Sequence, residues 1–364
     1  MRYWASLDGL RGLAVAAVML FHAQVSQVKG GFLGVDIFFV LSGFLISSQL
    51  LRELSRTGRV RWGSFFMRRL VRLQPALALL LLVYALGWVA GLVPGPGTVV
   101  ARDVATVLLA MAHWARAFDW YPPDYLGHAW SLGIEEQFYL LWALLLASLG
   151  AQVARPGRVF LLAVVCALAS MLWMLWLQTA GAGPVRLYNG LDTRAMALLC
   201  GCALAGGLHT CQPQLLDAAA FQPFTPKAQH VASFAGLGAL GLLLWAMVNA
   251  DWRAATMFPW GYMAAALLSA LLVWSVVVAP TGRLPCLLAW RPFVFLGKIS
   301  YGLYLWHYPL FRVAEAQAPK VGLTFANAMV LAACLSLLAA WASLVWVERP
   351  LRQRLSKSYR LSTA

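Results

Sequence analysis

Long apolar stretches alternate with short polar segments along the whole chain. A helix of about 20 apolar residues is long enough to cross the ~30 Å hydrocarbon core of a bilayer. We predict ten such helices, over about residues 9–27, 31–50, 73–93, 129–149, 157–178, 191–208, 231–249, 256–278, 292–312 and 323–347. A weaker apolar stretch over about 104–114 is too short to cross, and we expect it to lie on the surface or to re-enter the membrane.

The composition agrees with this pattern. Of the 364 residues, 62% are hydrophobic and only 11% are charged, whereas about a quarter of the residues in soluble domains are charged. No polar stretch is long enough for a separate soluble domain. We therefore predict that residues 1–364 form a single all-α, polytopic membrane domain. The six cysteines lie mostly within apolar runs and show no metal-binding spacing, so we expect no metal.

The distribution of positive charges indicates how the chain is oriented in the membrane. A net charge of +15 would suit nucleic acid, but the charges lie in loops rather than on one face, so we expect membrane lipids and no nucleic acid as partners. If the N-terminus is inside, 18 Lys and Arg residues fall on the inner side and seven on the outer side. Because positively charged loops stay in the cytoplasm, we predict a multi-pass membrane protein with both termini cytoplasmic. The Arg-rich segment 51–72 and the tail 348–364 then lie inside; the oligomeric state is not indicated.

Ionisable residues within the predicted spans are the first candidates for a site, because each costs free energy in the membrane and is usually paired or functional. Arg11 and His22 are eleven residues apart on the first helix, which places them on one face and ~16 Å apart along the axis. They could be two hydrogen-bonding residues that only pack helices together. An arginine near the inner end aligned with a deeper histidine better suits a path for a ligand.

The depth of three residues suggests a second feature. The connection 28–30 is short, so His22 and Asp36 should lie at similar depth on neighbouring helices, where Asp36 could orient and charge-stabilise His22. Glu135 falls at the same depth, so we expect these three residues in one site. A buried structural network is the alternative. Ser131, Glu135 and Tyr139 stand at i, i+4 and i+8 on one stripe of the predicted helix 129–149, and His128 lies just above it. The same segment adds Trp130 and Gln137 to the candidate residues.

Two further groups complete the candidate site. Helices near residues 191–208 and 292–312 contribute aromatic and polar residues that suit a sugar, although an interfacial aromatic belt would look similar; they are Asp192, Arg194, Tyr301, Tyr304 and His307. Near the inner surface, Arg68 or Arg69 lies beside Arg72 on one helical face. An arginine fork binds phosphate well, but these residues could simply anchor the loop on the inner side.

Six segments in the same order resemble the acyltransferase 3 family of membrane O-acyltransferases, and the likeness covers most of the chain. The segments are 7–12 (LDGLRG, followed by His22), 31–44 (GFLGVDIFFVLSGF), 69–72 (RLVR), 130–139 (WSLGIEEQFY), 297–307 (GKISYGLYLWH) and 347–350 (VERP). The resemblance implies a multi-pass protein of the bacterial inner (plasma) membrane, with acyl-CoA used from the cytoplasm and a glycan modified on the outer side. It also implies a catalytic role for His22, essential acidic residues at Asp36 and Glu135, and donor binding by arginines including Arg11.

Many relatives in that family carry an additional SGNH hydrolase-like domain, whereas this sequence stops soon after the last span and contains no Gly-Asp-Ser, so we expect the standalone form. The predicted function is transfer of an acyl group, most simply acetyl from acetyl-CoA, to a hydroxyl of an exported glycan. Exopolysaccharide, O-antigen and a lipid-linked sugar repeat are all candidate acceptors. His22 would act either as general base or as transient acyl carrier, and oxyanion donors could come from Arg11, Arg194 or Ser131.

Two functions of other classes compete with this one. A proton-coupled transporter could use the His, Asp and Glu residues as a relay, but it predicts inverted repeats and broken helices, which the sequence does not show. A non-catalytic assembly protein would tolerate substitution of the polar residues.

Overall fold

The computed structural model describes residues 3–150, 155–215, 217 and 221–354, and these residues form helices and no strands. Nine helical segments among them are long and apolar enough to cross a membrane, which confirms an all-α, polytopic architecture. They are Ala5–His22 (α1), Gly31–Thr57 (containing α2, Gly34–Thr57), Trp62–Val89 (α3), Gly127–Leu149 (containing α6, Trp130–Leu149), Pro156–Thr179 (α7), Leu191–Cys211 (α9), Pro226–Asn249 (α10), Trp260–Val278 (α11) and Phe325–Arg354 (containing α14, Phe325–Ala342).

The tenth predicted span, 292–312, lies within α13 (Arg291–Gln317), which has 27 residues and is too polar to count with the other nine. Lys298 is exposed, but two other polar side chains of this helix, Ser300 and His307, are buried inside the bundle. A helix enclosed by its neighbours need not be apolar on every face. The neighbours α1 and α14 pack along α13 and allow it to carry polar residues into the interior.

Two helix pairs cross in backbone contact at glycines. A Cβ atom added to Gly297 of α13 would lie 1.7 Å from the Asp8 carbonyl oxygen on α1. A Cβ on Gly43 of α2 would lie 1.9 Å from the Leu198 carbonyl oxygen on α9. Small residues allow membrane helices to approach this closely. The glycines of the family-like segments therefore fix how α1 meets α13 and how α2 meets α9.

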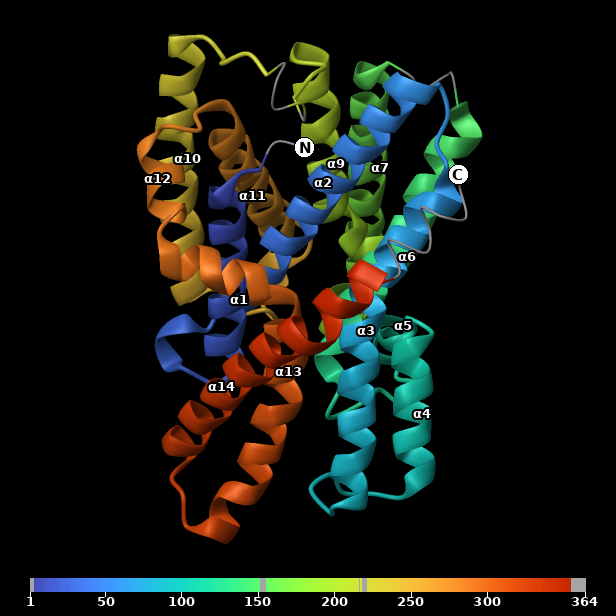
Figure 1. The fold of residues 1–364 in the computed structure, drawn as a ribbon, viewed down its shortest axis with the longest axis vertical. Helices are drawn as coiled ribbons and strands as arrows, with labels where there is room; N and C mark the ends of the chain where they lie inside the picture. The colour runs from blue at the N-terminus through green and yellow to red at the C-terminus, as the bar shows by residue number, and fades with distance from the viewer. Residues whose placement is uncertain (1–2, 151–154, 216, 218–220, 355–364) are drawn as a thin grey trace.

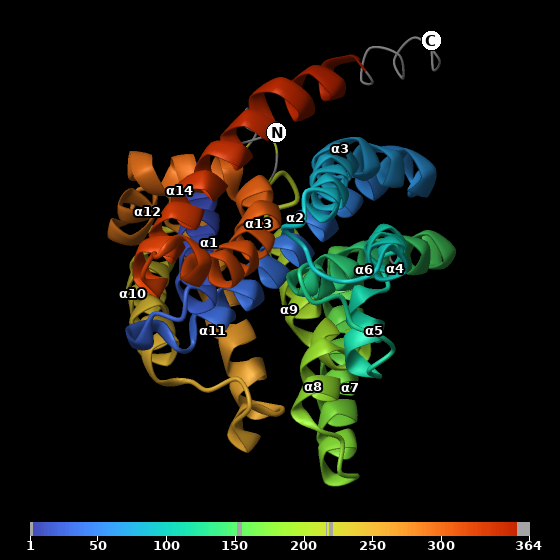
Figure 2. The ribbon, with the colours of Figure 1, turned by 90° about the horizontal axis from the view of Figure 1, so that it is seen from below.

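The helices form two groups joined through the middle of the molecule. Seen from below, α1 and α10–α14 lie on one side and α3–α8 on the other, with α2 and α9 between them (Figure 2). The connections after α3 and after α13 project at the lower end in Figure 1, whereas the connection between α2 and α3 lies at the upper end. These connections lie at opposite ends of the bundle, as expected for a chain that crosses a membrane back and forth. The cytoplasmic position of both termini stays a prediction.

The structure refines two local predictions. The predicted helical face of Arg69 and Arg72 belongs to a long helix, because α2 runs to Thr57 and α3 begins at Trp62, so the Arg-rich segment 51–72 is helical except at residues 58–61. The weak stretch 104–114 falls in two short helices, α4 (Gly97–Leu108) and α5 (Ala112–Ala117). A position on the surface is wrong for α5, which is mostly buried and packs against α6 and the short helix α8 (Pro184–Asn189). Re-entry into the membrane stays a prediction.

Candidate active site

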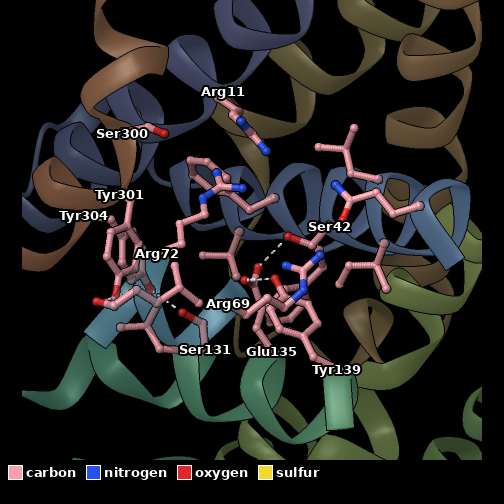
Figure 3. A pocket seen from close by; sticks show the side chains of 18 residues that line it. Arg11, Ser42, Arg69, Arg72, Ser131, Glu135, Tyr139, Ser300, Tyr301 and Tyr304 are labelled. Carbon is pink, nitrogen blue, oxygen red and sulfur yellow. Dashed lines mark hydrogen bonds between the residues drawn. The ribbon is translucent and has the colours of Figure 1, made fainter. Parts of the chain in front are cut away.

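Two pockets meet inside the helix bundle. The first, which we call the arginine pocket, encloses about 800 Å³ including its open mouth. Its lining includes Arg11, Val35, Ser42, Arg69, Arg72, Ser131, Glu135, Tyr139, Tyr301 and Tyr304 (Figure 3). The second, the histidine pocket, measures about 700 Å³ together with its open mouth and is lined by residues that include His22, Val35, Arg116, His128, Trp130, Tyr188, Tyr304 and Tyr308.

Three guanidinium groups and one carboxyl group give the arginine pocket a positive charge. Arg69 packs against aromatic faces, with its central carbon 4.3 Å from the centre of the Tyr139 ring and 4.8 Å from that of Phe65. Arg11 approaches Asp8 at 3.5 Å. Because guanidinium groups pair well with phosphate oxygens, this pocket suits the phosphorylated end of a donor such as coenzyme A.

The structure separates Arg68 from the other predicted donor residues. Its side chain is 57% exposed and lies 3.6 Å from Glu53, outside both pockets. Sequence spacing had left Arg68 and Arg69 as equal partners for Arg72, and the rotation of α3 selects Arg69.

Glu135 belongs to the arginine pocket. It accepts a hydrogen bond of 3.0 Å from the Ser42 hydroxyl and another from the Tyr139 hydroxyl. The predicted stripe of Ser131, Glu135 and Tyr139 on one face of α6 is present, since all three line this pocket. The expectation that Glu135 lies level with His22 in one site is wrong, because His22 lines the other pocket. Depth counted along the sequence assumed parallel helices, and these helices are tilted (Figure 1).

Hydrogen bonds to the backbone of α3 hold its arginines in place. The Tyr301 hydroxyl of α13 donates to the Leu73 carbonyl at 2.9 Å, and Arg352 donates to the Arg72 carbonyl at 3.1 Å. Arg352 is itself held by the buried carboxylate of Glu348 at 2.7 Å. Tyr301 was predicted to bind the acceptor, but it lines the arginine pocket and supports α3. Arg352 was missed because nothing in its local sequence shows that the last helix returns to α3.

In the histidine pocket, His22 is oriented by His307. His22 Nδ1 lies 2.9 Å from His307 Nε2, and His307 Nδ1 lies 3.1 Å from the Leu303 carbonyl oxygen. A carbonyl only accepts, so in a neutral ring His307 Nδ1 carries the proton and Nε2 is an acceptor. His22 then donates from Nδ1, which leaves its Nε2 with a free lone pair. This is the tautomer that a general base or an acyl-accepting nucleophile requires.

Asp36 does not support His22 as predicted. It is fully buried and pairs with the equally buried Arg194 of α9 at 2.8 Å. Arg194 also lies over the Tyr262 ring, 4.0 Å from its centre. The reason is rotation about α2: Val35 faces the pockets, and Asp36, one residue and about 100° further on, faces α9. Asp36 and Arg194 together form a buried ion pair that joins α2 to α9, and neither residue lines either pocket.

The remaining predicted residues divide between the pockets and the scaffold. His128 and Trp130 line the histidine pocket, and Tyr304 lines both pockets. Two others lie elsewhere. Gln137 donates to the Ala110 carbonyl just before α5 at 3.0 Å and accepts from the Trp114 indole of α5 at 3.2 Å. Asp192 pairs with Arg186 and accepts from the Trp173 indole at 2.7 Å.

Arg116 is a pocket residue that the sequence did not single out. It lies on α5, lines the histidine pocket and donates from Nε to the Asn189 side chain at 3.1 Å. In the sequence it counted only as one loop charge among several. Its guanidinium group gives the histidine pocket a cation near His22 and His128, with no carboxylate among the described lining residues.

These features define a membrane-embedded acyltransferase: residues 4–345 match the acyltransferase domain family, and the chain belongs to it. The chain is 34% identical to the putative peptidoglycan O-acetyltransferase YrhL of Bacillus subtilis and 31% identical to the peptidoglycan O-acetyltransferase OatA of Listeria monocytogenes, covering 56% of each. It is 30% identical to the O-acetyltransferase OatA of Staphylococcus aureus, covering 58% of it. These alignments include 98%, 97% and 98% of the present chain, respectively.

The chain thus spans little more than half the length of these curated relatives. The expectation of a standalone enzyme stays a prediction, because the match concerns only part of each relative. No solved structure matches the chain.

Proposed function

We propose that this protein transfers an acetyl group from acetyl-CoA, held in the arginine pocket, to a sugar hydroxyl held in the histidine pocket. One observation carries the proposal: a pocket with three arginines and a pocket with two histidines meet in the bundle and share Val35 and Tyr304. The family match and the O-acetyltransferase relatives support the same chemistry.

The chemistry follows from the tautomer of His22. As general base, Nε2 takes the proton of the sugar hydroxyl while the oxygen attacks the thioester carbonyl, and the thiolate that leaves is protonated to give CoA. As acyl carrier, Nε2 attacks the carbonyl itself and expels the CoA thiolate; the sugar oxygen then attacks the acyl carbon, the bond to Nε2 breaks, and the hydroxyl proton goes to the thiolate to give CoA. Both routes need the nitrogen that the His307 contact leaves free. Arg116 is placed to stabilise negative charge on the acyl oxygen.

The relatives narrow the proposed acceptor. Two of them are named for peptidoglycan, so we propose a peptidoglycan-type glycan in place of the exopolysaccharide, O-antigen or lipid-linked repeat expected from the sequence. We further propose that the protein lies in the bacterial plasma membrane. The arginine pocket would open toward the cytoplasm, where acetyl-CoA is found, and the histidine pocket would face the outside. The many outward-facing apolar side chains, such as Leu161, Leu172 and Trp245, support contact with lipid.

The decisive experiment measures acetyl transfer by the purified full chain from labelled acetyl-CoA to soluble peptidoglycan fragments. His22→Gln keeps a hydrogen-bonding side chain but removes the base, so we expect a loss of at least ~10²-fold. The matched control is His230→Gln, because His230 is exposed on α10 and lines neither pocket. Transfer by His22→Gln at the rate of the control would refute the role of His22. Absence of transfer by the unaltered chain with every glycan tested would refute the proposed activity.

A further inference from the structure

Val35 of α2 and Tyr304 of α13 stand where the two pockets meet. Both residues line both pockets, and both are nearly inaccessible, with 4% and 6% of their surface exposed. Arg11, Arg69 and Arg72 line only the arginine pocket, and His22 lines only the histidine pocket. If CoA phosphates rest on the arginines, the thioester end can meet His22 only by passing these two side chains.

Two hydrogen bonds hold the Tyr304 side chain in place. Its hydroxyl lies 2.6 Å from the Ser131 hydroxyl and donates to the His128 carbonyl at 3.0 Å. Figure 3 shows Tyr304 beside Ser131, at the end of the arginine pocket away from Glu135 and Tyr139. Swinging the ring aside would break both contacts in a buried place, where an unpaired polar group is costly. The aromatic ring is therefore a fixed wall.

The position of the Val35 side chain is also fixed. The residue before it, Gly34, is so close to α1 that a Cβ there would lie 2.4 Å from the Ala14 carbonyl oxygen. The backbone of α2 is thus pressed against α1 at this point. A valine in a helix also has one strongly preferred side-chain rotamer. Its two methyl groups present an apolar surface of fixed position.

We propose that Val35 and Tyr304 form a constriction that admits the acetyl end of the donor and rejects branched acyl groups, which are wider than the unbranched arm that carries the thioester. The inference rests on the proposed function and adds the acyl-group specificity. In the reaction the bond between the acyl carbon and sulfur breaks and a bond from that carbon to the sugar oxygen forms. The hydroxyl proton goes by way of His22 to the departing thiolate, so no redox partner is needed. Only the width of the acyl group is selected at the constriction.

The test compares acetyl-, butyryl-, isobutyryl- and pivaloyl-CoA as donors for the purified full chain, with kcat and KM measured for each. Val35→Ala removes two methyl groups from the constriction, and we expect isobutyryl transfer relative to acetyl transfer to rise by about 10-fold or more, since one methylene in an apolar pocket is worth ~10- to 200-fold. Val35→Ile adds a methylene and should lower kcat for acetyl-CoA with little change in KM. Val40→Ala and Val40→Ile are matched controls, because Val40 is buried on the same helix and lines neither pocket.

The outcomes separate this inference from the proposed function. A rise in the transfer of branched acyl groups relative to acetyl in Val35→Ala but not in Val40→Ala supports the constriction. Acetyl transfer that proceeds normally, with the same profile in both alanine variants, overturns the constriction and leaves the acetyltransferase function standing. No transfer by the unaltered chain from acetyl-CoA overturns both. If Val35→Ile fails to accumulate, the alanine pair still decides the matter.

Discussion

His22 on α1 and His307 on α13 are joined ring to ring, with 2.9 Å between Nδ1 of the first and Nε2 of the second. The Leu303 carbonyl fixes the other nitrogen of His307. Because these contacts end at a backbone carbonyl of α13, they place the proton of His22 on Nδ1 without the help of a carboxylate. In the serine-protease triad an aspartate has the corresponding place. Here a neutral imidazole orients the base, which suits a site inside a membrane where an unpaired charge is costly.

His307 can be tested as a positioning residue by two substitutions. His307→Leu removes the acceptor for His22 Nδ1–H, and we expect acetyl transfer to fall by about 10²-fold, the scale on which a misaligned general base loses its effect. His307→Gln can still accept from His22 through its carbonyl oxygen and donate to the Leu303 carbonyl, so it should keep much of the activity. Steady-state kinetics would show the loss in kcat rather than in KM for acetyl-CoA. Equal activity of the two variants would contradict this role.

We expect Asp36 to contribute to the stability of the fold and not to catalysis. Asp36→Asn leaves the buried Arg194 guanidinium uncompensated, which typically costs about 3–5 kcal/mol. We expect a lower unfolding temperature in detergent and a lower amount of protein in the membrane. Arg194→Gln together with Asp36→Asn removes both charges, so the double variant should lose less than the sum of the two single losses.

The specific activity of folded Asp36→Asn provides the contrast with a catalytic role. We expect it to stay close to that of the unaltered chain, because Asp36 lines neither pocket. A protein of normal stability with a large loss of kcat would show that Asp36 supports His22 directly, as the sequence had suggested.

Donor binding should distinguish three neighbouring arginines. Arg69→Ala and Arg72→Ala each remove a guanidinium group from the arginine pocket, and a hydrogen bond to a charged group is worth ~1.5–3 kcal/mol, so we expect KM for acetyl-CoA to rise about 10- to 100-fold. Lysine at either position should restore only part of the loss, since it lacks the planar fork. Arg68→Ala is the matched control, because Arg68 is exposed outside the pocket. Equal effects of all three alanine variants would point to general attraction by the loop.

The crossing of α1 and α13 can be tested at Gly297. Its added methyl group would meet the Asp8 carbonyl at 1.7 Å, so Gly297→Ala must push the helices apart. Such overpacking costs about 1–3 kcal/mol and should also weaken the contact between His22 and His307. Gly238→Ala on α10 is the control, since a Cβ there meets nothing within 4 Å. Thermal unfolding and acetyl transfer of both variants measure the effect, and unchanged behaviour of Gly297→Ala would argue against this close crossing.

The sequence by itself determined the helical spans and several faces. A stretch of about 20 apolar residues predicts a membrane helix regardless of the neighbouring segments, because the bilayer places the same requirements on each spanning segment. Spacing within one helix is equally local, which is why Ser131, Glu135 and Tyr139 were predicted on a shared face and line one pocket. The helix 292–312 was also predicted, although its buried polar face makes it less apolar than the other spans.

Only the tertiary structure decided which side chains meet. Asp36 turns to Arg194 and His22 to His307 because glycine contacts set where α2 crosses α9 and where α1 crosses α13. The partners are 158 and 285 residues apart in sequence, so no local spacing could pair them. The division into an arginine pocket and a histidine pocket has the same origin. Depth along separate helices can be counted from sequence, but helix tilt and rotation arise from packing between distant segments.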